Sequence, residues 1–288
     1  MIKAVIRGGL GNQLFQYASA YALARRLNQP LVLDASFYPK QTLRGFRLGC
    51  FHLSEHEVSE RNDCMAEALY KQKMVNGLIR RTNFSTLPYK RGKYLIDHAG
   101  KFTPGFFTIN AKNVFLNGYF QSEEYFAECR DELLKQLTPN YEPEPSYQEV
   151  LEAIRNSNSV AVHVRRGDFV GDASKFHYVL DAGYYENAIC TMRKSVEEPS
   201  FFCFSDDIDW VKEQIRQTED FQFVSLKTSH ADIDEMMLMK SCKHIITANS
   251  TFSWWAAWLN ENESAIRIVP DRPYGNDKMI PKGWMRLA

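Results

Sequence analysis

The 288-residue sequence has no excess of charge of either sign, because its 35 Lys and Arg residues match its 35 Asp and Glu residues. Proteins that depend on nucleic-acid binding usually carry a basic excess, so this composition argues against that class. No apolar run of the sequence reaches membrane-spanning length, and the N-terminus has no hydrophobic segment typical of a signal peptide. We therefore expect a cytoplasmic protein that binds no nucleic acid.

The sequence also lacks the cysteine spacing of a zinc site, since its six cysteines form no CxxC pair. Reduced, mostly buried thiols are the better expectation for a cytosolic protein. Two D-x-D patterns, at residues 207–209 and 232–234, are of a kind that can bind a divalent cation beside a diphosphate. Both open predicted helices, where acidic residues favour the helix dipole, so we expect no metal site.

The N-terminal turn GGLGNQ, residues 8–13, lacks one of the glycines that a dinucleotide-binding turn needs. It follows a predicted strand and opens a predicted helix. Dinucleotide-binding turns follow the pattern GxGxxG, and Leu14 occupies the place of its last glycine. The turn instead presents the amide side chains of Asn12 and Gln13. We therefore expect no nicotinamide or flavin cofactor, and an NAD-dependent oxidoreductase is only an alternative function.

The chain is expected to form two domains joined by the proline-rich segment TPNYEPEPSY, residues 138–147. Before this linker, an opening strand, turn, helix and strand lead into an irregular region at residues 40–108. After it, apolar strands alternate with helices, which indicates a parallel, doubly wound α/β sheet. The strands predicted there are residues 160–164, 201–204, 221–225, 244–247 and 266–269.

Polar clusters follow three of these strands, namely RRGD at residues 165–168, SDD at 205–207 and NST at 249–251. The carboxyl ends of parallel strands lie at one edge of a sheet, so we expect the clusters to face one crevice. Paired arginines bind phosphate without a metal ion, and a helix start holds an anion. Taken singly, SDD and NST are equally typical of helix caps, and Arg165 and Asp168 could form an internal ion pair that holds the loop. Together they predict a site for a phosphate-bearing ligand.

Three tryptophans lie close together in SWWAAWL, residues 253–259. Tryptophan rings can stack on sugars, but this near-helical spacing favours a place in the core. We therefore predict that Trp254, Trp255 and Trp258 are buried.

Every charged residue between Glu67 and Asp97 is basic. Such a run is most often the solvated face of a loop. The alternative is contact with an anionic acceptor or a membrane surface. The residues concerned are Lys71, Lys73, Arg80, Arg81, Lys90, Arg91 and Lys93.

Four stretches of the sequence resemble glycosyltransferase family 11, the α-1,2-fucosyltransferases, in its bacterial form. They are GGLGNQLFQYA at residues 8–18, HVRRGD at 163–168, FSDD at 204–207 and NSTFSWWAAWL at 249–259, in the family's order. The resemblance implies the GT-B type of α/β fold, in which two Rossmann-like domains, each with a parallel sheet, face each other across a cleft. The domains implied are residues 1–140, on the acceptor side, and residues 148–288, which would bind GDP-fucose.

The activity that this resemblance implies is inverting, metal-independent transfer of L-fucose from GDP-β-L-fucose to the 2-hydroxyl group of a terminal β-galactoside. The acceptor would be an oligosaccharide or glycolipid of a bacterial surface glycan such as O-antigen. The basic stretch at residues 71–93 would then contact the inner membrane peripherally. A fucosyltransferase of another linkage and a non-catalytic nucleotide- or carbohydrate-binding module are the alternatives.

The resemblance also implies roles for the candidate site residues. Arg165 would stabilise the charge that builds on the β-phosphate, with support from Arg166 and a further donor from Asn12. One of Asp206 and Asp207 would recognise ribose or guanine.

The general base is open among Asp168, His163 and His177, of which His177 is also a candidate for substrate binding. The other residues expected to bind substrate come from the glycine turn, from the second and third polar clusters and from the two residues that follow the third cluster. They are Gly9, Gly11, Gln13, Ser205, Asn249, Ser250, Thr251, Phe252 and Ser253.

Overall fold

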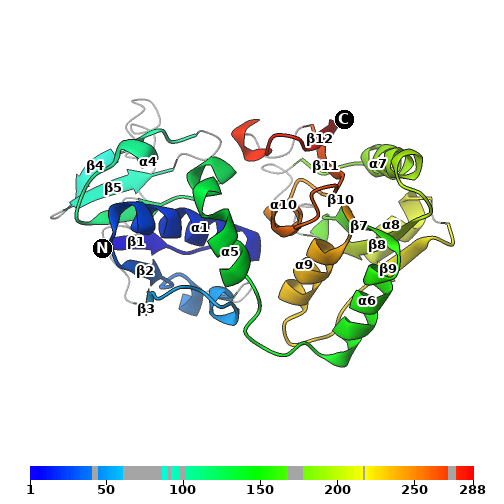
Figure 1. Ribbon diagram of the computed structural model, residues 1–288, viewed down its shortest axis with the longest axis horizontal. Coiled ribbons are helices and arrows are strands. Elements are labelled where there is room, and N and C mark those ends of the chain that lie inside the picture. Colours follow the sequence, from blue (N-terminus) through cyan, green and yellow to red (C-terminus); the bar gives the residue numbers. More distant parts are fainter. Residues whose placement is uncertain are drawn as a thin grey trace. The chain divides into compact units, whose positions relative to one another are not determined.

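The structure is a computed structural model in which residues 1–40, 45–60, 86–89, 92–97, 102–167, 178–216, 218–271 and 277–288 are described (Figure 1). The chain forms two compact units. Unit 1 is Met1–Asn140 with Asn276–Met279, and unit 2 is Tyr141–Gly275 with Ile280–Ala288. Each unit contains one six-stranded sheet, which confirms the predicted α/β class.

The sheet of unit 1 is parallel except at one edge. Its strands are β1 (Ile2–Val5), β2 (Leu31–Asp34), β3 (Glu57–Ser59), β4 (Thr86–Tyr89), β5 (Gly92–Ile96) and β6 (Val114–Asn117). Their order is β3-β2-β1-β6-β5-β4, and only the edge strand β4 runs antiparallel to its neighbour. The prediction of an irregular region at residues 40–108 is wrong for β3, β4 and β5, because strands of three to five residues are too short to show a clear alternation.

Helix α1 (Leu10–Leu27) connects β1 to β2 and begins inside the predicted glycine turn. It buries Leu14, Phe15 and Ala18 completely, so its apolar face packs in the core of the unit. Asn28 ends the helix in the left-handed conformation, with a φ of 48°. The other helices and 3₁₀ turns among the described residues of the unit are α4 (Gly105–Thr108), α5 (Arg130–Gln136), η1 (Tyr38–Lys40), η2 (Leu48–Cys50), η3 (Glu123–Tyr125), η4 (Ala127–Cys129) and η7 (Asp277–Met279).

The sheet of unit 2 is parallel throughout. Its strands are β7 (Asn158–Val164), β8 (Pro199–Ser205), β9 (Phe221–Val224), β10 (His244–Ile246), β11 (Arg267–Pro270) and β12 (Met285–Leu287), in the order β12-β11-β10-β7-β8-β9. All five predicted strands are confirmed within two residues. The helices are α6 (Pro145–Arg155), α7 (Ala182–Ser195), α8 (Ile208–Gln214), α9 (Ala231–Ser241) and α10 (Thr251–Leu259).

Helix α6 begins within the segment that the sequence predicts to be a linker. Pro145 occupies its first turn, where proline is well tolerated because no N–H is needed there. The proline content therefore marks the start of a helix as well as the junction between the units.

The strand order of unit 2 reverses between β7 and β10. The chain runs from β7 outward to β8 and β9, then returns to β10 on the other side of β7. Open α/β sheets bind ligands beyond the carboxyl ends of the strands at such a switch point. The three polar clusters of the sequence follow β7, β8 and β10, and they therefore lie at this point of the sheet.

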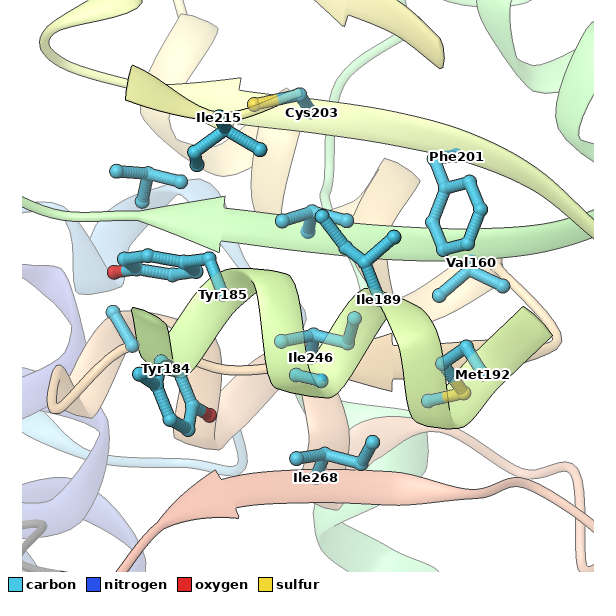
Figure 2. Packing of buried hydrophobic residues seen from close by; sticks show 14 of the residues in the cluster. Val160, Tyr184, Tyr185, Ile189, Met192, Phe201, Cys203, Ile215, Ile246 and Ile268 are labelled. Carbon is cyan, nitrogen blue, oxygen red and sulfur yellow. The ribbon is translucent and has the colours of Figure 1, made fainter. Parts of the chain in front are cut away.

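The core of unit 2 holds β7 in place (Figure 2). Val160, Val162 and Val164 of β7 belong to one buried cluster with Tyr185 and Ile189 of α7. Their spacing of two residues places these valines on one face of the strand. His163 faces the opposite side, toward α10, where its ring lies 5.4 Å from that of Phe252.

The three tryptophans of α10 lie in the core, as predicted. Trp254 and Trp255 are fully buried and Trp258 is 3% exposed, so none of them offers a face to a sugar. Among the described cysteines, Cys129, Cys203 and Cys242 are buried, whereas Cys190 is exposed. In the described part of the chain, no helix has the length and apolar character needed to cross a membrane.

Candidate functional site

The site is built where β7 and β8 end side by side. The two strands pair over seven consecutive positions, the last of which places Val164 beside Ser205. The residue after β7 is Arg165, and the residue after β8 is Asp206. Their side chains form an ion pair with 2.8 Å between Arg165 Nη1 and Asp206 Oδ2.

Arg166 is held by both aspartates of the second cluster. Its backbone N–H donates to Asp206 Oδ1 at 2.8 Å, and its Nε donates to Asp207 Oδ2 at 3.2 Å. Its guanidinium carbon lies 4.0 Å from the centre of the Trp210 ring, a cation–π contact. The arginines thus pair with the aspartates of the second cluster. The alternative of an ion pair between Arg165 and Asp168 is not tested, because Asp168 lies outside the described residues. Trp210 is a member of the cluster that the sequence did not suggest.

Asp207 also caps helix α8. Its Oδ1 accepts a hydrogen bond from the backbone N–H of Trp210 at 3.2 Å. Ser205 Oγ accepts one from the N–H of Asp207 at 3.0 Å, which fixes the turn between strand and helix. The cap interpretation is thus also correct for this residue, and the cap and the ion pair share one carboxylate.

The two D-x-D patterns have the structural positions predicted for them. Asp209 lies in the first turn of α8, and Asp232 and Asp234 lie in the first turn of α9. Asp234 is buried and accepts hydrogen bonds from Tyr141 Oη at 2.7 Å and Thr228 Oγ1 at 2.5 Å. These carboxylates therefore stabilise helix starts and a loop.

The start of α10 is the third part of the site. Ser250 is its N-cap, and the Oγ accepts a hydrogen bond from the N–H of Phe252 at 3.3 Å. Thr251 is the first residue of the helix. Because β10 neighbours β7, this helix start lies beside the end of β7, where its N–H groups favour an anion.

Two other residues of this cluster make structural contacts. Ser253 Oγ accepts a hydrogen bond from the N–H of Ala248 at 3.2 Å. Asn249 Nδ2 donates to the carbonyl oxygen of Tyr178, which ties the end of β10 to the segment before α7. Both side chains therefore shape the loop that leads into α10.

His163 is a buried, uncharged group. It is 4% exposed, and its Nδ1 has no hydrogen-bond partner among the described residues. Burial, with a further contribution from the positive charge of Arg165, lowers the pKa of His163 to about 3. A group with so low a pKa takes up a proton poorly at neutral pH, which disfavours His163 as a general base.

This histidine should make unit 2 sensitive to acid. The pKa of His163 falls from 6.5 in an unfolded chain to about 3 in the folded one, so the unfolded chain binds more protons between these values. The free energy of unfolding should therefore decrease as the pH drops from about 6.5 toward 3. His163→Gln should flatten this dependence, as measured by urea unfolding at several pH values.

The slope against pH is the quantity to compare, because the substitution itself costs stability at every pH. Burial raises the pKa of Glu235 to about 7, which acts in the opposite direction between 4.5 and 7. That contribution is common to both proteins and cancels. His52→Gln, at an exposed position, is the control for losing a histidine and should keep the wild-type slope. A His163→Gln protein with the wild-type slope would contradict the role given to His163.

In unit 1, the amide of Gln13 is fully used within the glycine turn. Gln13 is 1% exposed, and its Nε2 donates to the carbonyl oxygens of Gly45 at 2.9 Å and Gly8 at 3.2 Å. Its Oε1 accepts a hydrogen bond from the N–H of Arg47 at 2.8 Å. Gly9 is the N-cap of α1, and its carbonyl accepts from the N–H of Gln13. Gln13 thus fixes the shape of the turn.

Asn12 is held by a residue outside the candidate set. Gln121 Nε2 donates to Asn12 Oδ1 at 2.9 Å. Gly8 has a φ of 84°, and a Cβ there would lie 2.9 Å from Asn12 Nδ2. Gly11 is buried in the first turn of α1. The position of Gln121 after β6, the neighbour of β1, is the signal that could have identified it.

Two candidates for the general base, Asp168 and His177, lie outside the described residues. The same holds for most of the basic stretch, of which Lys93 is described as part of β5. Contact with a membrane through this stretch stays a prediction.

Comparisons with known proteins identify the family of the chain. The family model of glycosyl transferase family 11 matches residues 64–286. An α-1,2-colitosyltransferase of Escherichia coli is 33% identical over 100% of this chain and 99% of its own length. The O-antigen biosynthesis glycosyltransferase WbnK, also of E. coli, is 33% identical over 98% of this chain and 99% of its own length.

More distant similarities point the same way. Galactoside alpha-(1,2)-fucosyltransferase 2 of Oryctolagus cuniculus is 27% identical over 93% of this chain and 70% of its own length. The crystal structure of fucosyltransferase NodZ from Bradyrhizobium superposes with a TM-score of 0.55 at 13% identity, covering 89% of this chain and 92% of NodZ, which supports the fold. The extent of the family match and the identity to full-length relatives show that this chain is a glycosyltransferase of glycosyl transferase family 11.

Proposed function

We propose that this enzyme transfers L-fucose from GDP-β-L-fucose to the 2-hydroxyl group of a terminal β-galactoside, with inversion and without a divalent metal, in the synthesis of a bacterial surface glycan. The observation that carries the proposal is the position of Arg165 and Arg166 directly after β7, beside the switch point between β7 and β10. The names of the family relatives support an α-1,2 linkage and an O-antigen setting.

The two arginines and the start of α10 take the place of a metal ion in this mechanism. As the bond between fucose and phosphate breaks, the sugar becomes oxocarbenium-like and negative charge builds on the β-phosphate. Arg165 and the N–H groups at Ser250 and Thr251 stabilise that charge, with Arg166 as a supporting cation. A well-placed donor of this kind supplies roughly 3–4 kcal/mol of transition-state stabilisation.

Recognition of the nucleotide and removal of the acceptor proton complete the mechanism. One of Asp206 and Asp207 pairs with the N–H groups of guanine or with the ribose hydroxyls. A general base removes the proton of the acceptor hydroxyl. We assign this role to Asp168 or His177, since the low pKa of His163 makes that residue the weakest candidate. Asn12, with its amide oriented by Gln121, contributes a hydrogen bond to substrate.

A different donor sugar is the second candidate. The α-1,2-colitosyltransferase of E. coli is 33% identical over the whole chain. Colitose is a fucose that lacks one ring hydroxyl group, so GDP-colitose would occupy the same phosphate site. The rate of GDP release distinguishes the two donors, since the proposed enzyme should release GDP from GDP-fucose faster than from GDP-colitose.

Release of GDP from the donor in the presence of EDTA tests the proposal. We expect release from GDP-fucose to be stimulated by lactose, a terminal β-galactoside, and to be unchanged by EDTA, because positively charged side chains and a helix start neutralise the phosphate. Faster release from GDP-colitose would favour the second candidate. A folded protein that binds GDP but releases none from either donor, with any of a panel of β-galactosides, would contradict both.

A further inference from the structure

Asp206 contacts two consecutive residues of the arginine cluster. Its Oδ2 accepts from the guanidinium of Arg165 and its Oδ1 accepts from the backbone N–H of Arg166, both at 2.8 Å. The side chains of Arg165 and Asp206 are 28% and 26% exposed, so the pair lies at the surface of the unit. An ion pair with this exposure contributes little to stability, and its main effect is to fix the direction of the guanidinium.

Gly167 leaves the room that this carboxylate needs. A Cβ at Gly167 would lie 2.8 Å from Asp206 Oδ2 and 3.2 Å from its Cγ. Any larger residue at this position would therefore displace the oxygen atom that accepts from Arg165. The contact is with the end of a side chain, so the fold itself can accommodate the change.

We propose that Asp206 is a positioning residue that presents Arg165 to the β-phosphate of the donor, and that Gly167 is part of the same device. Both oxygens of Asp206 accept from the arginine segment, and both oxygens of Asp207 accept as well, from Arg166 and from the N–H of Trp210. The contact with the guanidinium of Arg165, which Asp206 makes, is what assigns the positioning role to Asp206. The inference rests on the proposed contact between Arg165 and the β-phosphate. It assigns a role to one of the two aspartates that the proposed function leaves undivided.

The affinity for GDP relative to GMP is the measurement that reports on this role. GMP lacks the β-phosphate, so the preference for GDP reflects the contact with Arg165. Asp206→Asn should reduce this preference by about 3- to 10-fold, the cost of ordering one long side chain on binding. The preference for GDP over ADP, which depends on the base, should be unchanged, and kcat should fall while the thermal midpoint stays close to that of the wild type.

Gly167→Ala provides a second variant that removes no polar group. It should reproduce the loss of GDP preference by displacing the carboxylate of Asp206. Gly49→Ala is the matched control, because a Cβ there meets nothing within 4 Å. In an Arg165→Ala background, Asp206→Asn should have no further effect on the preference, since the side chain that it positions is gone.

Three results would overturn the proposal. A loss of the preference for GDP over ADP in Asp206→Asn would assign Asp206 to guanine. A stronger preference for GDP over GMP in Asp206→Asn would mean that Asp206 competes with phosphate for Arg165. An unchanged preference in this variant would mean that Asp206 does not position Arg165. A wild type that prefers GDP to GMP but transfers no fucose would contradict the proposed function alone, whereas one without that preference would contradict the contact between Arg165 and phosphate.

Discussion

Replacing Arg165 with alanine is expected to reduce the rate of GDP release from GDP-fucose by about 10²- to 10³-fold, the loss that follows removal of one well-placed donor to a developing negative charge. The core holds the strand that precedes Arg165, and Asp206 holds its guanidinium at 2.8 Å. The residue is therefore already oriented before substrate arrives. Release of GDP at saturating donor and lactose measures the effect.

Lysine at this position separates charge from geometry. Arg165→Lys keeps the positive charge but loses the planar fork that contacts carboxylate and phosphate through two parallel hydrogen bonds. We expect it to recover only a small part of the activity lost in Arg165→Ala. Both variants should unfold at nearly the wild-type temperature, because the ion pair that alanine removes and lysine alters is partly exposed.

Arg193 is the matched control for these variants. It lies in α7 of the same unit, is 34% exposed and pairs with Asp220 at 3.0 Å, but it is not at the end of β7. Arg193→Ala should therefore leave GDP release unchanged. Equal losses in the two alanine variants would show that the effect comes from the fold, and full activity in Arg165→Ala would remove this residue from the phosphate site.

The sequence predicts the strands of unit 2 better than the contacts between them. The alternation of apolar strands and helices is regular after residue 157, and the predicted clusters do follow β7, β8 and β10. The pairing of Arg165 with Asp206 depends on the register between two strands, which no local pattern encodes. The sequence therefore predicts separate roles for the arginines and the aspartates, whereas in the structure they form one cluster.

Amide side chains illustrate a second limit of sequence reasoning. Asn12 and Gln13 are adjacent in a glycine turn. Asn12 is predicted to be a donor to the phosphate and Gln13 to bind substrate. Gln13 is buried, and a buried amide must form hydrogen bonds, which it finds in the backbone at Gly45 and Arg47. Whether an amide faces a ligand or the backbone depends on its burial. The partners of Gln13 lie at residues 45–47, too far along the sequence for the turn alone to predict these hydrogen bonds.

Trp254→Ala should lower the free energy of unfolding of unit 2 by about 3–5 kcal/mol, the usual cost of removing a large aromatic side chain from a core. Trp254 is fully buried, and its ring lies 5.2 Å from Trp255, 6.2 Å from Trp258 and 5.7 Å from Trp284, measured between ring centres. The surrounding rings are rigid and held by their own neighbours, so the cavity cannot close fully. Urea unfolding followed by circular dichroism measures the loss.

Trp284→Ala is the control, because this ring packs against the same Trp254 but is only partly buried. Its loss should be clearly smaller, since less apolar surface returns to water. Comparing Trp254→Ala with Arg165→Ala separates the contribution of α10 to stability from the contribution of Arg165 to phosphate binding. The tryptophan variant should lose stability and, while it remains folded at low temperature, keep a preference for GDP over GMP, whereas the arginine variant should lose that preference and keep its stability. A Trp254→Ala protein of wild-type stability would mean that the start of α10 is held by contacts other than this aromatic cluster.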